Sequence, residues 1–203
     1  MATTFRSALV LTINPAVPVK TLAEFIAYAK ANPGRINYAS PGVGTLPHVA
    51  GELLRSLTGV DIVHVPYRGS YIPDVLAGQV QAMFSSISTS LDFIVQGKLR
   101  ALGVTSVDRA DVLRDVPTIA ETAPGYEAYI WDALAVPSAT PPEIVATLNR
   151  EVNAVLAEPT IRTRLIALGA DPLVMSVADA AKFVADETAK WGKVIRAAGI
   201  KAE

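Results

Sequence analysis

The sequence contains no cysteine, and this absence excludes several classes of protein. Without thiols there is no disulfide framework, no cysteine nucleophile and no cysteine-based zinc site. Long apolar runs are missing as well, because proline, glycine or a charged residue interrupts each of them well before the ~20 residues that cross a bilayer. We therefore expect no transmembrane helix in this sequence.

The sequence also lacks an excess of either charge: 18 Lys and Arg face 19 Asp and Glu, which gives a net charge of -1. No cluster of Lys or Arg is interleaved with aromatic residues, so the attraction that nucleic acids require is absent, and we expect no DNA or RNA partner. The opening Met-Ala-Thr-Thr-Phe-Arg has no apolar core of a secretory signal. This is typical of a cytosolic protein or of a chain without its signal peptide.

What the sequence does have is length and apolar content. Hydrophobic residues make up 51% of its 203 residues. A chain of this length buries ~70% of the surface that its unfolded form exposes, which is enough for one substantial core or two small lobes.

Short β-prone segments alternate with helical segments through the first half of the chain. Strands are expected at residues 5–13, 36–39, 61–65, 79–84 and 99–105. Helices are expected between them, from Thr21, from Thr45, around 73–77 and at 91–96. This order predicts an α/β fold with a mostly parallel sheet flanked by helices, in which ligands bind at the carboxyl ends of the strands.

The second half has a different pattern. An extended segment at 128–136 contains Trp131, and helices are expected at 143–157, 159–168 and 177–198, with a short β-prone segment at 173–175. Apolar residues recur on these helices at helical spacing, which predicts one apolar face on each.

A glycine loop at residues 40–45 is the principal candidate binding element. Ser40-Pro-Gly42-Val-Gly44-Thr45 follows a strand and precedes a helix that Thr45 is expected to cap. The first amides of such a helix have no intrahelical partner and lie at its positive end, so the loop suits an anion, most simply a carboxylate. The alternative is a tight strand-to-helix connection with no ligand.

Other polar and aromatic residues could join this loop. The serines Ser85, Ser86 and Ser88 precede a helix, where hydroxyls donate to an oxyanion or act as caps. His48 lies in the first turn after the glycine loop, where a ligand-facing role and a structural role are both open. His64 lies within an apolar strand and is interpreted as structural. Tyr67 and Trp131 belong either to the core or to a cleft wall.

The same residues argue against a metal or an organic cofactor. Neither histidine has a second ligand-type residue at metal spacing. The Gly42-Val-Gly44 segment runs into Pro47 instead of completing a dinucleotide fingerprint, which disfavours NAD. No Gly-x-Ser-x-Gly elbow occurs, and no base is evident for a serine nucleophile.

Several motifs together resemble the Bug family, the substrate-binding proteins of tripartite tricarboxylate transporters. They lie at residues 18–24, 37–45, 48–54, 61–69, 76–80, 97–106 and 115–118. The resemblance implies a type II periplasmic-binding-protein-like fold, in which two α/β lobes close on a small carboxylate or dicarboxylate without catalysis. It also implies a periplasmic location and, at full length, membrane transporter subunits as partners.

The resemblance further implies a domain division and a set of site residues. Residues 1–127 would form the second lobe, and residues 128–203 would cross back and supply helices to a first lobe that is otherwise missing. We then expect a homo-oligomer, formed either by pairing these helices across a two-fold axis or by exchanging them between copies. Many family members have a carboxylate where this chain has Ser85-Ser86, so a simple carboxylate fits better than an amino acid. The implied ligand-binding residues are Ser40, Gly42, Gly44, Thr45, His48, Tyr67, Ser85, Ser86, Ser88 and Trp131.

Two other functions compete with this one. One is an enzyme that acts on small organic acids, for which an acid/base pair is missing from the loops. The other is an assembly or regulatory protein that reuses the lobe without a ligand.

Overall fold

The computed structural model describes residues 2–201, which form two compact units. The larger unit contains Ala8–Tyr129 and the residues from Lys193 on. The smaller unit contains residues 2–7 and Ile130–Gly192. The strand β1 (Ala2–Ile13) and the helix α7 (Val177–Ala197) therefore contribute residues to both units. The predicted division between residues 127 and 128 concerns the lobes of a complete receptor and stays a prediction.

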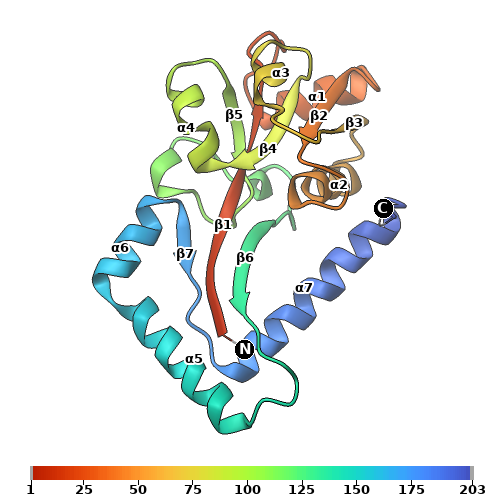
Figure 1. The fold of residues 1–203 in the computed structure, drawn as a ribbon. Coiled ribbons are helices and arrows are strands. Elements are labelled where there is room, and N and C mark those ends of the chain that lie inside the picture. Colours follow the sequence, from red (N-terminus) through yellow and green to blue (C-terminus); the bar gives the residue numbers. More distant parts are fainter. Residues whose placement is uncertain (1, 202–203) are drawn as a thin grey trace. The chain divides into compact units, whose positions relative to one another are not determined.

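The larger unit is built on a sheet with the strand order β3-β2-β4-β1-β5 (Figure 1). The strands other than β1 are β2 (Ile36–Ser40), β3 (Ile62–Pro66), β4 (Ala82–Ser86) and β5 (Arg100–Val104). β2 is parallel to β3 and β4, whereas β1 is antiparallel to β4 and β5. The α/β class is confirmed, but the sheet is mixed. β1 can run in the opposite direction because no βαβ crossover joins it to its two neighbours.

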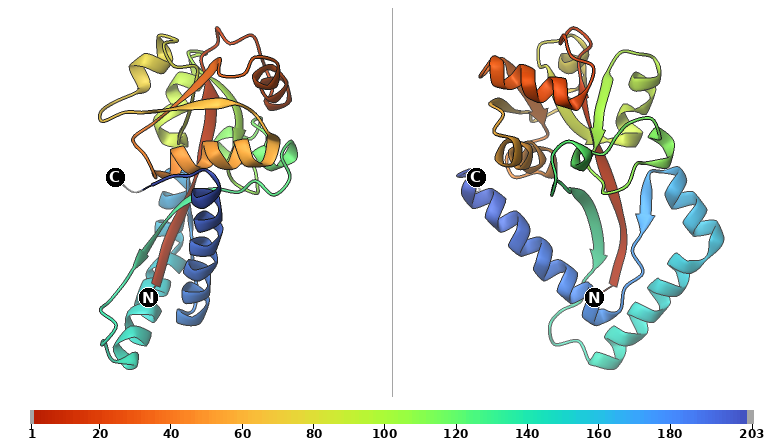
Figure 2. Two further views of the ribbon diagram at one scale, coloured as in Figure 1. Left: turned by 90° about the vertical axis from the view of Figure 1, so that its right-hand side faces the viewer. Right: turned by 180° about the vertical axis from the view of Figure 1, so that it is seen from behind.

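Helices α1 (Leu22–Ala31), α2 (Leu46–Thr58), α3 (Ile72–Leu76) and α4 (Ile87–Val95) connect these strands. Two short 3-10 turns, η1 (Asp111–Leu113) and η2 (Ile119–Glu121), follow β5. α2 packs on β2, β3 and β4 (Figure 2) and buries Val49, Leu53 and Leu54 against them. Leu57, four residues after Leu53, is 44% exposed near the end of α2.

The position of β4 differs from the predicted range 79–84. Gly78 ends α3 with a φ of 77°, and the amides of Gln79 and Val80 bond to the carbonyl of Asp74. These residues therefore complete a turn before the strand begins. At the other end, Ser85 and Ser86 extend β4 because they pair with Val10 and Leu9 of β1.

In the smaller unit, β6 (Tyr129–Leu134) and β7 (Ala170–Pro172) pair with β1, with Phe5 opposite Pro172. The helices α5 (Pro142–Ala157), α6 (Pro159–Ala167) and α7 confirm the three helices predicted for this half. β7 lies earlier than the β-prone segment at 173–175. None of the helices within residues 2–201 combines the length and apolar character needed to cross a membrane.

Candidate functional site

The carboxyl ends of β2 and β4 bring two predicted binding segments to the same side of the larger unit's sheet. Here the word edge means this border formed by strand ends, not an outermost strand. The two strands are parallel neighbours, and each leads directly into a helix, β2 through the glycine loop into α2 and β4 into α4. Adjacent strands lie about 4.8 Å apart, so the glycine loop and the serines after Phe84 start close together. The structure therefore brings the start of Ser40–Thr45 close to Ser85–Ser88, whereas a shared ligand site stays a prediction.

The glycine loop has a backbone that other residues adopt with difficulty. Gly42 has a φ of 145° and Gly44 a φ of 78°. Thr45 stands at the N-cap position of α2, but its side chain does not cap the helix as predicted, because Oγ1 donates to the carbonyl of Gly42 at 2.7 Å. Pro47 has no N–H, so the N–H groups of Leu46 and His48 are the first-turn donors that α2 offers.

Ser40 holds the loop from inside. Its side chain is fully buried, and Oγ lies 2.6 Å from Nε2 of His64 and 3.0 Å from the carbonyl oxygen of Gly42. The N–H of Gly42 donates to the same Oγ at 3.1 Å. These bonds shape the loop, and they already engage the N–H of Gly42, one of the two glycines implied as ligand-binding. Direct contact between Ser40 and a ligand stays a prediction.

The two histidines meet beneath the loop. Their rings are stacked, with centroids 3.7 Å apart and planes 6° from parallel. Nδ1 of His48 accepts the N–H of Gly44 at 3.0 Å, so the second glycine amide is also engaged. Burial lowers the pKa of His48, and burial together with the neighbouring His48 lowers the pKa of His64 to about 4. Both rings are thus neutral at pH 7, as acceptance by His48 Nδ1 requires.

A buried polar network that the sequence did not reveal fixes the start of α2. The hydroxyl of Tyr38 donates to Oε1 of Glu52 at 2.9 Å and to the carbonyl of His48 at 3.2 Å. Glu52, only 7% exposed, also accepts two bonds from Arg55, at 3.0 and 2.8 Å. Burial, and next the charge of Glu52, raise the pKa of Tyr38. The network ties strand β2 to the helix that carries His48.

The serines after Phe84 divide into two groups. Ser85 is buried, and its hydroxyl bonds to that of Ser90, so this pair is internal. Ser86 is the N-cap of α4, and its Oγ lies 2.5 Å from Oγ1 of Thr89 and 3.3 Å from Oγ of Ser88. Ser88 and Thr89 are exposed. These accessible hydroxyls, and not Ser85, present donors at the edge of the sheet.

The two predicted aromatic residues have other partners in this structure. The hydroxyl of Tyr67 donates to Oδ2 of Asp74 at 2.8 Å, and its ring lies 6.1 Å from that of Tyr71. Trp131 belongs to the smaller unit, where its ring packs edge-on against Phe183 at 5.4 Å. A role for either one in a cleft wall stays a prediction.

Ser106 is a candidate that the sequence analysis missed. It follows β5, so it lies toward the same edge of the sheet as Ser40 and Ser86. Its side chain is 7% exposed, and its Oγ is buried without a hydrogen-bond partner among the described residues. The rule that ligands gather at strand ends could have found it, because Thr105-Ser106 ends a predicted strand.

The edge as a whole is equipped to hold an anion. α2 and α4 both start there, so the positive ends of their dipoles lie at neighbouring strand ends, although the N–H of Thr89 in α4 already bonds to Oγ of Ser86. The side chains present are hydroxyls and neutral imidazoles. No group of three His, Asp or Glu residues within 2–201 is placed to hold a metal ion.

Solved structures with the same fold define the class of protein. The chain resembles Rpa4515 of R. palustris, solved with adipate, at 35% identity and a TM-score of 0.84 over 98% of this chain and 68% of that one. It resembles MatC of Rhodopseudomonas palustris, solved with malate, at 31% identity and a TM-score of 0.75, over 96% of this chain and 68% of that one. The periplasmic binding protein BugD matches at 28% identity and a TM-score of 0.80, over 99% of this chain and 69% of that one. The fold is that of a periplasmic binding protein.

The family follows from the sequence match. Residues 1–200 match the model of the tripartite tricarboxylate transporter family receptor. The chain belongs to this family, which confirms the resemblance drawn from the motifs. The chain spans 54% and 60% of the length of the first two curated relatives that it matches.

Proposed function

We propose that this chain forms the carboxylate-holding part of a solute receptor that works with a tripartite tricarboxylate transporter in the periplasm. The observation that carries the proposal is the pair of helix N-termini at the ends of the neighbouring strands β2 and β4. A carboxylate there would accept N–H bonds from the first turn of α2 and hydroxyl bonds from Ser86 and Ser88.

The class of ligand is a small mono- or dicarboxylate. Structures of relatives with adipate and malate support this proposal. The family resemblance supports it as well, because many members have a carboxylate where this chain has Ser85 and Ser86, and a carboxylate is the group that would bind an ammonium. An amino acid would bring a charged ammonium to an edge that offers mainly donors.

Calorimetric titration of the chain with adipate, malate, acetate and aspartate tests the proposal. We expect adipate or malate to bind and aspartate to bind more weakly. Gly44→Val should weaken binding by about tenfold or more, because the branched side chain strains the loop and projects beside the amides that hold the anion.

Gly59→Val is the matched control. Gly59 has a φ of 69° against 78° for Gly44, and a Cβ at either position meets no atom within 4 Å. The control therefore imposes similar backbone strain at the other end of α2. Equal binding by the two variants would remove the loop from the site. Consumption of the acid, followed by NMR, would instead indicate an enzyme.

A further inference from the structure

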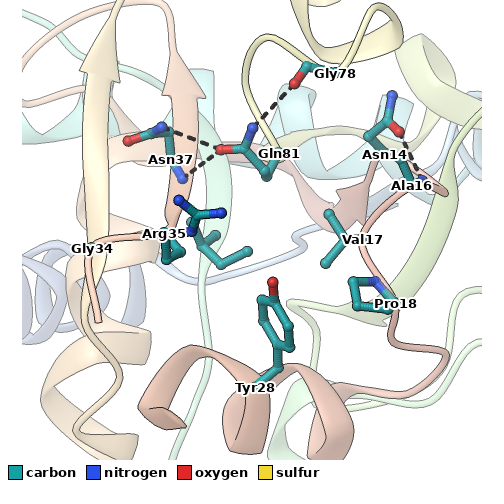
Figure 3. A pocket seen from close by; sticks show the side chains of 11 residues that line it. Asn14, Ala16, Val17, Pro18, Tyr28, Gly34, Arg35, Asn37, Gly78 and Gln81 are labelled. Carbon is teal, nitrogen blue, oxygen red and sulfur yellow. Dashed lines mark hydrogen bonds between the residues drawn. The ribbon is translucent and has the colours of Figure 1, made fainter. Parts of the chain in front are cut away.

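A second cavity lies at the opposite edge of the larger unit's sheet from the glycine loop. It has a volume of about 470 Å³, and its lining includes Asn14, Val17, Tyr28, Arg35, Asn37 and Gln81 (Figure 3). Arg35 precedes β2 and Gln81 precedes β4, whereas Ser40 and Ser86 end those strands. Five residues of strand separate the two edges by about 16 Å. The cavity is therefore distinct from the candidate carboxylate site.

Amide side chains build a fixed wall for this cavity. Asn14 is 8% exposed, and its Nδ2 donates to the carbonyls of Val75 and Leu76 at 2.9 and 3.1 Å while its Oδ1 accepts the N–H of Ala16. Oε1 of Gln81 accepts two bonds from Asn37, at 3.0 Å from the backbone N–H and 3.2 Å from Nδ2. Because these groups satisfy one another, the wall is preorganised.

Two strong donors in the lining have no such partner. The guanidinium of Arg35 makes no ion pair or side-chain hydrogen bond with any described residue, and neither does the hydroxyl of Tyr28. Figure 3 shows the hydroxyl of Tyr28 pointing from α1 into the space that Arg35, Val17 and Pro18 also border. None of the 11 lining residues is acidic, so the charge of Arg35 is not neutralised within the cavity.

We propose that this cavity binds an organic oxyanion, a carboxylate or phosphate monoester with a short apolar part. The charged group would pair with the planar guanidinium of Arg35, which offers two parallel N–H donors, and would accept a further bond from Tyr28. The apolar part would lie against Val17 and Pro18. Val17 is only 6% exposed and is held in place by its neighbours, so the exposed Pro18 would offer most of this apolar contact. The guanidinium is solvated, so we expect Kd values on the order of 1 mM.

An NMR titration with benzoate, phenyl phosphate and the neutral benzamide tests the proposal. The side-chain amide signals of Asn37 and Gln81 report on the cavity, and the backbone signals of Gly42 and Gly44 report on the glycine loop. We expect saturable shifts at Asn37 and Gln81 with benzoate or phenyl phosphate, and none with benzamide. Which of the two anions binds more tightly distinguishes a carboxylate from a phosphate site.

Two arginine variants distinguish binding in this cavity from non-specific attraction of the anion to surface charge. Arg35→Gln should weaken the binding of the anion by about fivefold, and Tyr28→Phe by a smaller factor. Arg162→Gln removes the same charge from an exposed position of the smaller unit and should leave the titration unchanged. Equal shifts in Arg35→Gln and Arg162→Gln would overturn the proposal. So would benzamide binding as tightly as benzoate, or shifts confined to Gly42 and Gly44.

Discussion

The stacked histidines show how single residues support the glycine loop without offering charge to a ligand. His64 holds Ser40 and His48 holds Gly44, and both bonds are made by neutral rings whose pKa is lowered. Glu52 is the acidic group that counteracts this lowering for both rings. The loop therefore depends on two uncharged imidazoles, although either histidine alone could be taken for a ligand contact.

This pairing predicts a loss of stability in acid. His64 has a pKa of about 4 in the folded chain against 6.5 as the ordinary value, so between these values the unfolded chain binds more protons. The contribution is fully present above pH 6.5 and is lost as the pH falls toward 4. Allowing for partial solvent exposure, we expect a loss of about 1 to 2 kcal/mol in the free energy of unfolding.

Urea unfolding at pH 7.5 and 4.5 measures this loss, with His64→Gln as the comparison. Carboxylates such as Glu121, whose pKa the bond from Arg109 lowers, also titrate in acid. They contribute equally to both chains, so the difference between the two pH dependences isolates His64. An identical pH dependence in wild type and variant would contradict the assignment.

At the scale of elements, the packing of α2 on β2 depends on the absence of a side chain at Gly51. A Cβ built there would lie 2.4 Å from Cε2 and Cζ of Tyr38. The ring cannot move freely, because Tyr38 is fully buried and its hydroxyl bonds to Glu52 and to the carbonyl of His48.

We therefore expect Gly51→Ala to destabilise the chain by about 1 to 2 kcal/mol, the cost of overpacking outweighing the better helix propensity of alanine. Gly69→Ala is the control, because Gly69 has no atom within 4 Å of a built Cβ and should change the free energy of unfolding little. Denaturant titrations of both variants check this. A stabilised Gly51→Ala would show that α2 can shift away from β2 at little cost.

The elements themselves were largely predictable, because their signals are local. The helices α5, α6 and α7 begin and end within a residue or so of their predicted bounds, where proline, a cap or glycine stops the apolar repeat. The predicted bounds of β4 were wrong at both ends, because its start depends on bonds to the carbonyl of Asp74 and its end on pairing with β1. The link between His64 and Ser40 depends on the parallel pairing of β2 with β3, which no local pattern encodes. The partners of Tyr38 were missed because they depend on how α2 packs on β2, which is also a tertiary contact.

At the scale of the whole molecule, the helices of the smaller unit bury little of their apolar surface. Among the described residues, α5 buries only Asn149 and Leu156, α6 none and α7 only Ala180. Ile144, Leu148 and Val155 of α5 remain 47, 45 and 49% exposed. Their spacing of four and seven residues places them on one face of the helix, and an exposed apolar face is typical of an interaction surface.

We expect this surface to drive self-association, with α5 as part of the contact. Light scattering coupled to size exclusion should show a mass that rises above 21.4 kDa with concentration. Leu148→Lys should return the chain to a monomer, whereas Glu151→Lys, at an exposed polar position of the same helix, should not. A wild-type monomer at every concentration would refute the expectation.

The position of β1 in the sheet has a consequence for how the chain folds. β1 lies between β4 and β5, with Leu9 opposite Ser86 and Val10 opposite Val104, although it precedes both strands by most of the larger unit. During synthesis its buried residues Leu9, Val10 and Leu11 must wait for partners that emerge much later. Such non-local pairing slows folding and leaves a strand open to wrong partners in the meantime. A chaperone that shields β1 until β4 and β5 have emerged should therefore raise the yield of native chain.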